Sequence, residues 1–165
     1  MDQDNALAQL ASHLGQQLNA ARWQLTTAES CTGGLVAATI TALAGSSHWF
    51  DRGFVTYSIQ SKIEMLGVAA ELIERHGAVS EPVARAMAAG ALRHSAAQLA
   101  LAVTGIAGPT HGGEDKPVGT VCFAWSHAQK THCETQHFKG NRQQIRRQAV
   151  EHALRGVLGL LEGVV

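Results

Sequence analysis

One short stretch of the sequence combines a hydroxyl, a carboxylate, a thiol and two glycines: Thr26-Thr27-Ala28-Glu29-Ser30-Cys31-Thr32-Gly33-Gly34. It follows a short apolar run, Trp23–Leu25, and precedes an amphipathic run, Leu35–Leu43, so it predicts a strand-to-helix junction. A helix N-terminus carries unpaired N–H groups and partial positive charge, which stabilise an anion or a developing oxyanion. Chemistry at this junction would be nucleophilic attack by a serine hydroxyl.

We therefore predict Ser30 as the nucleophile, with Glu29, Gly33 and Gly34 beside the substrate, because glycines allow a ligand to approach the backbone closely. The alternative is that Ser30 or Thr32 only caps the helix, since both residue types are common helix caps.

Tyr57 and Lys62 lie five residues apart, across the predicted end of a strand and the first turn of a helix. A serine hydroxyl needs a base within hydrogen-bond reach, and a lysine made neutral by desolvation can serve. A neighbouring phenol could relay or position the proton. The alternative is that Lys62 is solvated near Glu64 and that Tyr57 is a strand residue with an exposed hydroxyl.

A third candidate is Thr104-Gly105-Ile106-Ala107-Gly108-Pro109, which follows an apolar run and could form an anion-binding nest of backbone N–H groups. It could equally be an ordinary turn after a strand. Arginines near the start of the last predicted helix could clamp a phosphate or carboxylate, or could line its polar side. They are Arg142, Arg146 and Arg147.

The nine histidines do not form a metal-binding pattern, because no HExxH or paired CxxC spacing is present. His132 and Cys133 are adjacent and therefore point to opposite faces of a strand. We predict neither a metal site nor an organic cofactor.

Composition favours one globular domain over residues 1–165, with 45% apolar and 16% charged residues. The formal net charge is +0 and no basic run interleaved with aromatics occurs, which argues against a nucleic-acid partner. Neither a signal peptide nor an apolar run of membrane-spanning length is visible. The three cysteines lack CxxC spacing, as in reduced cytosolic proteins, so we expect a cytoplasmic protein with no membrane partner.

Hydrophobic periodicity and turn residues predict alternating helices and strands followed by a hairpin joined at Ser126–Lys130. The expected helices are Gln3–Ala21, Leu35–Leu43, Gln60–Leu66, Ala69–Arg75, Glu81–Ser95 and Arg142–Leu161. The expected strands are Trp23–Leu25, Trp49–Tyr57, Gln98–Val103, Val118–Trp125 and Thr131–Phe138.

This order favours an α/β fold: a three-layer α/β/α sandwich with a mixed, mostly parallel sheet closed by an antiparallel hairpin. Ligands of such sheets bind beyond the carboxyl ends of the strands. Ser30, Tyr57 and Thr104 each follow a predicted strand, so we expect them to converge on one site.

With these residues identified, the chain resembles the CinA C-terminal domain family from about Leu7 to Leu161. The resemblance rests on the order and joint presence of six motifs. They are T-T-A-E-S-C-T-G-G at 26–34, G-S-S-H-W-F at 45–50, F-V-T-Y-S at 54–58 with Lys62, G-A-V-S-E-P at 77–82, T-G-I-A-G-P at 104–109 and K-P-V-G-T-V at 116–121.

The resemblance implies hydrolysis of the carboxamide of nicotinamide mononucleotide to nicotinate mononucleotide and ammonia, a step of pyridine nucleotide salvage, without a cofactor. It also implies a catalytic serine, lysine and tyrosine, which match Ser30, Lys62 and Tyr57. It further implies self-association, and substrate contacts from the threonine and from an arginine of the last helix. These match Thr104, with Gly105 and Gly108 beside it, and Arg142, with Arg146 as second choice.

One departure is Ile59, where the family usually carries Asn. It removes an amide near the site. Two other functions remain open for a chain of this fold: a non-catalytic domain that binds a nucleotide or a protein, and an amidase for another small amide.

Overall fold

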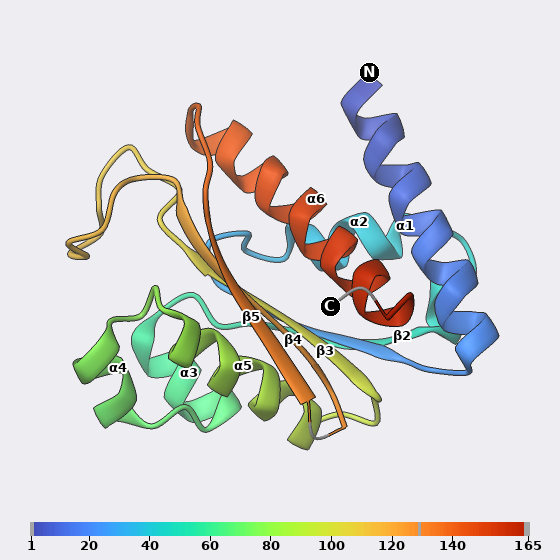
Figure 1. Ribbon diagram of the computed structural model, residues 1–165, viewed down its shortest axis with the longest axis horizontal. Coiled ribbons are helices and arrows are strands. Elements are labelled where there is room, and N and C mark those ends of the chain that lie inside the picture. The colour runs from blue at the N-terminus through green and yellow to red at the C-terminus, as the bar shows by residue number, and fades with distance from the viewer. Residues whose placement is uncertain (1, 129, 164–165) are drawn as a thin grey trace.

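Helices cover both faces of one sheet in the computed structural model, which describes residues 2–128 and 130–163 (Figure 1). In chain order the elements are α1 (Asp2–Ala21), β1 (Leu25–Glu29), α2 (Leu35–Thr41), a 3-10 turn (Ser46–His48), β2 (Phe50–Val55), α3 (Ile59–Leu66), α4 (Ala70–His76), α5 (Glu81–Arg93), β3 (Leu99–Gly105), β4 (Thr120–His127), β5 (Lys130–His137) and α6 (Arg142–Leu161).

The described strands form a sheet of order β2-β1-β3-β4-β5. β1 pairs in parallel with both β2 and β3, whereas β4 is antiparallel to β3 and to β5. β1, β2, β3 and β5 therefore run in the same direction, and β4 runs in the opposite direction. The predicted mixed, mostly parallel sheet closed by an antiparallel hairpin is confirmed. Of the hairpin loop predicted at Ser126–Lys130, Gln129 lies outside the described residues.

The two faces of the sheet carry separate hydrophobic clusters. α1, α2 and α6 pack on one face against the larger side chains of β3, and α3, α4 and α5 lie on the other (Figure 1). In β3, Leu99, Leu101 and Val103 face the α6 side, while Ala100 and Ala102 face α5. This burial on both sides explains the uninterrupted apolar run and confirms the predicted three layers.

The first strand is the largest difference from the sequence prediction. β1 does not stop at Leu25 but continues through the polar residues Thr26 and Thr27 to Glu29, and all of it is buried. The Thr26 hydroxyl donates to Arg52 O at 2.8 Å, so neighbouring backbone satisfies a polar group inside the sheet. β-branched threonines fit a strand, and pairing on both sides holds them there.

The carboxyl ends of β2, β1 and β3 share one edge of the sheet because these strands are adjacent and parallel. β2 ends at Val55, two residues earlier than predicted, and the Thr56 N–H then donates to Glu29 O at 2.8 Å. The segments around Ser30, Tyr57 and Thr104 thus meet at this edge, as the strand pattern predicts.

The predicted helix starts at Ser80 and Arg142 are confirmed by side-chain caps. The Ser80 hydroxyl accepts from Val83 N–H, with a proline in the first turn of α5. Asn141 and Gln144 form a reciprocal capping box at the start of α6. Among the described residues, no helix is long and apolar enough to cross a bilayer.

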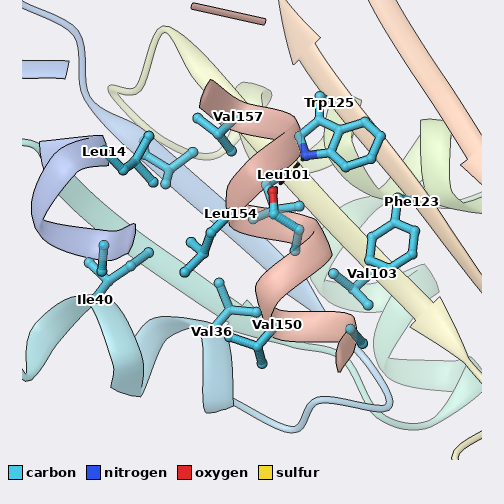
Figure 2. Packing of buried hydrophobic residues seen from close by; sticks show 14 of the residues in the cluster. Leu14, Val36, Ile40, Leu101, Val103, Phe123, Trp125, Val150, Leu154 and Val157 are labelled. Carbon is cyan, nitrogen blue, oxygen red and sulfur yellow. Dashed lines mark hydrogen bonds between the residues drawn. The ribbon is translucent and has the colours of Figure 1, made fainter. Parts of the chain in front are cut away.

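The sheet and α6 are locked together by Trp125. Its indole Nε1 donates to Ala153 O at 2.9 Å, and the ring stacks on Phe123 with centroids 5.6 Å apart (Figure 2). One turn along α6, Gly156 faces the same ring, and a Cβ built there would overlap the indole carbons. Gly156 is therefore a packing requirement of the helix.

Gly156→Ala should lower the free energy of unfolding by about 1–3 kcal/mol, although alanine is the better helix former, because the added methyl overpacks the core. Urea denaturation would measure this as a lower midpoint with an unchanged slope. In a Trp125→Leu background the same change should be far less damaging, because the ring is gone. Equal losses in both backgrounds would contradict the packing explanation.

Candidate active site

Ser30 is the first residue after β1 and is nearly buried, with 8% of its surface exposed. Its N–H donates to Val103 O and its carbonyl accepts from Gly33 N–H, both at 3.0 Å, so the turn is fixed on both sides. Gly33 and Gly34 have φ values of 56° and 98°, which lie in the left-handed region that glycine adopts without strain. The two glycines therefore shape this turn, while the Ser30 side chain faces a pocket.

The cap of α2 is supplied by Glu29. Its buried carboxylate accepts from Val36 N–H at 2.9 Å and from Ala37 N–H at 3.1 Å, while the cap position itself, Gly34, makes no side-chain bond. The alternative in which Ser30 or Thr32 caps the helix is therefore wrong. Glu29 does not line the pocket, and its carboxylate is already satisfied by the helix, so the structure gives no support to substrate contact by this residue.

Lys62 lies in α3 with only 1% of its surface exposed, and its Nζ donates to Ser30 Oγ at 3.0 Å. Nζ also donates to Thr56 O at 2.7 Å and reaches Tyr57 O at 3.5 Å. Burial lowers the pKa of Lys62 from 10.5 to about 8, partly opposed by electrostatic effects of Cys31 and Glu114. The alternative of a solvated Lys62 is wrong.

Cys31 also lines the pocket but is not an activated thiol. Burial raises the pKa of Cys31 to about 12, against an opposing effect of Arg146, so the sulfur carries its proton. A thiolate is the reactive form of cysteine, and the side chain that pairs with the lysine is therefore the serine.

Tyr57 and Arg142 meet at the rim of the pocket. Arg142 donates to the Tyr57 hydroxyl at 3.1 Å and to Gly108 O at 2.8 Å. Tyr57 is 61% exposed, and its phenol contacts the arginine while only its backbone carbonyl approaches Lys62. The side chain of Tyr57 is exposed, as the alternative interpretation expects, but its hydroxyl accepts a hydrogen bond from Arg142.

The other two arginines lie outside the pocket. Arg146 donates to Cys31 O at 3.1 Å and to Thr32 O at 3.0 Å, so it holds the backbone of the Ser30 turn. Arg147 pairs with Asp4 of α1. Of the three candidate anion clamps, Arg142 is the one that lines the pocket.

Thr104, Gly105 and Gly108 line the same pocket, whose volume is about 300 Å³. The Thr104 hydroxyl donates to Ala78 O at 2.8 Å, so toward the pocket it can only accept a hydrogen bond. A Cβ at Gly105 would lie 2.7 Å from Val121, and Gly108 has a φ of 82°. Gly105 is therefore required by close packing and Gly108 by its backbone conformation.

The pocket is also lined by Ile106 and Ala107, which belong to the predicted stretch 104–109. The lining residues that were not predicted from the sequence are Ala78, Val79, Thr110, His111 and Gly112. The apolar lining residues lie in the family motifs at 77–82 and 104–109, but small apolar residues in a turn do not by themselves indicate a chemical role. Ile59, where a family amide is missing, is largely exposed and is not among the lining residues.

Within the described part of the chain, no group of three or more His, Cys, Asp or Glu side chains could hold a metal ion. In the same part of the chain the N–H groups of Cys31 and Thr32 donate to no other residue, although those on either side, of Ser30 and Gly33, are bonded. The arrangement joins a serine hydroxyl to a buried lysine of lowered pKa, which is suited to acyl transfer.

The chain is similar to curated proteins over most of its length. It is 52% identical over 156 residues to the nicotinamide-nucleotide amidohydrolase PncC of Escherichia coli (strain K12), covering 92% of each chain. It is 48% identical over 151 residues to the protein of the same name from Pseudomonas putida, covering 92% and 94%.

The fold comparison agrees with the sequence comparison. The crystal structure of the competence/damage inducible protein CihA from Agrobacterium tumefaciens superposes with a TM-score of 0.89 at 42% identity, covering 93% of this chain and 94% of that one. The family model described as "CinA C-terminal domain" matches residues 7–161. With that match spanning nearly the whole sequence, the chain belongs to the CinA C-terminal domain family.

Proposed function

We propose that the protein hydrolyses the carboxamide of nicotinamide mononucleotide to nicotinate mononucleotide and ammonia, a step of pyridine nucleotide salvage. The observation that carries the proposal is the 3.0 Å hydrogen bond between the buried Lys62 Nζ and Ser30 Oγ. The relatives named nicotinamide-nucleotide amidohydrolase, about half identical over most of the chain, supply the substrate.

In the first step neutral Lys62 takes the hydroxyl proton of Ser30, and Oγ attacks the carboxamide carbon. The direct Lys62–Ser30 bond supports transfer without a relay, so we assign the Tyr57 phenol, together with Arg142, to the substrate. The negative oxygen of the tetrahedral intermediate would be held by the amides of Cys31 and Thr32. Each such donor is worth about 3 kcal/mol.

In the second step protonated Lys62 returns its proton to the departing nitrogen, and ammonia leaves an acyl-enzyme on Ser30. Water, deprotonated by the same lysine, then hydrolyses the ester and releases nicotinate mononucleotide. Thr104 would accept a hydrogen bond from a substrate N–H or O–H, because its own proton is already donated to Ala78 O. All steps use side chains and amides of this chain.

Ser30→Ala should abolish ammonia release from the mononucleotide, by roughly 10⁴-fold or more, because the nucleophile is lost. Its urea unfolding midpoint should stay close to that of the wild type. Ser61→Ala is a matched control, since that hydroxyl donates to Ser58 O and does not line the pocket. Near-normal turnover in a folded Ser30→Ala protein would sink the nucleophile assignment.

Tests of wild type on a panel of amides would separate the proposal from the two other functions. A non-catalytic binding domain would release no ammonia from any amide. An amidase of different specificity would prefer another member of the panel.

The pH profile should report the lowered pKa of Lys62. Since the neutral amine is the base, kcat/KM of the wild type should rise through a pKa of about 8 and level off above it. Lys62→Arg should be nearly as inactive as Lys62→Ala, because arginine stays protonated in proteins. If arginine restores much of the activity, the side chain at this position acts through its charge.

Arg142→Ala should raise the KM for the mononucleotide at least tenfold, since charge-assisted bonds to the phosphate are worth roughly 1.5–3 kcal/mol each. The KM for the riboside, which has no phosphate, should barely change. Arg155→Ala is the control on the same helix, because Arg155 pairs with Glu151 at the surface. Equal damage to both substrates would move the phosphate assignment away from Arg142.

A further inference from the structure

The loop between β3 and β4 is tied to the turn before α5 by one carboxylate. Glu114 Oε1 accepts from Ala78 N–H at 2.9 Å and from Val79 N–H at 3.4 Å. Its Oε2 lies 3.5 Å from Lys116 Nζ, which in turn donates to His76 O at 3.2 Å. The Glu114 side chain is only 17% exposed, so these bonds form in a partly desolvated place.

The backbone beside this carboxylate leaves room for it. Gly77 has a φ of 82°, and a Cβ there would lie 2.6 Å from Glu114 Oε2. A glycine therefore permits both the turn and the close approach of the loop. The Glu114 contact therefore involves residues of both the loop and the turn, and it is more than one ion pair at the surface.

This contact reaches the candidate active site through one peptide group. The peptide between Ala78 and Val79 donates its N–H to Glu114 and accepts the Thr104 hydroxyl proton at its carbonyl oxygen. Ala78, Val79 and Thr104 all line the pocket. Glu114 thus holds the partner that orients the Thr104 hydroxyl.

The same loop supplies another part of the wall. His111, which also lines the pocket, has its Nδ1 2.6 Å from Lys116 O, so the pocket-lining half of the loop is braced on the half that carries Glu114. Release of Glu114 would remove the bonds that join this loop to the Ala78 and Val79 amides.

We propose that Glu114 is a positioning residue: its hydrogen bonds fix the Ala78–Val79 wall and the 110–117 loop around the substrate. The kinetic part rests on the proposed function of Ser30 and Lys62. The contact itself can be tested without turnover.

Two variants separate the hydrogen bonds of Glu114 from its charge. Glu114→Ala removes the acceptor and the charge, so it should raise the KM for the mononucleotide at least tenfold and speed hydrogen exchange at the Ala78 and Val79 amides. Glu114→Gln removes the charge but keeps an acceptor oxygen, so it should change the KM and the exchange rates much less than Glu114→Ala does.

Asp115→Asn is the matched control, because it is the same chemical change on the neighbouring, exposed residue. It should alter none of these quantities. Unchanged exchange at the Ala78 and Val79 amides in Glu114→Ala, or an equally large effect of Glu114→Gln on that exchange, would overturn the proposal. If exchange responds as expected while the wild type releases no ammonia, the positioning role of Glu114 stands and the proposed function falls.

Discussion

The burial of the Lys62 amine is the constraint on which the rest of the site depends. Its Nζ is held by a carbonyl at the end of one strand and a hydroxyl at the end of the next, Thr56 O and Ser30 Oγ. Among the described residues no carboxylate forms an ion pair with it. Desolvation therefore favours the neutral amine, which is the state that a base requires. Leu66 of the same helix packs with α5 residues such as Met87, which holds α3 in place.

Much of the fold could be predicted because long elements carry repeated signals. α1 and α6 follow from apolar residues at helical spacing, and β3 from an apolar run covered on both faces. The end of β1 could not be predicted, because Thr26 and Thr27 are polar residues that are buried only when β1 pairs with its neighbouring strands. Their burial depends on strands that come later in the sequence, at Arg52 and beyond, which no local pattern contains.

The site was predictable where chemistry coincides with a strand end, as at Ser30 and Thr104. It was not predictable where a side chain serves a distant backbone. Arg142 and Arg146 are four residues apart and share a face of α6, so spacing cannot tell them apart. They differ because the carbonyls of Cys31 and Thr32 lie against the second arginine. Glu114 is a similar case, since its partners are 35 and 36 residues away.

Glu29 determines which backbone N–H groups near Ser30 remain available to bind an anion. Its carboxylate accepts hydrogen bonds from N–H groups at the N-terminus of α2. It therefore offsets much of the partial positive charge of that helix end before any ligand binds. In the proposed reaction, polarisation of the substrate carbonyl would then come from individual amides of the Ser30 turn, each acting through a single hydrogen bond. This polarisation would not depend on the length of the helix behind the turn. A substrate whose carbonyl is displaced by about an ångström would react roughly 10²-fold more slowly.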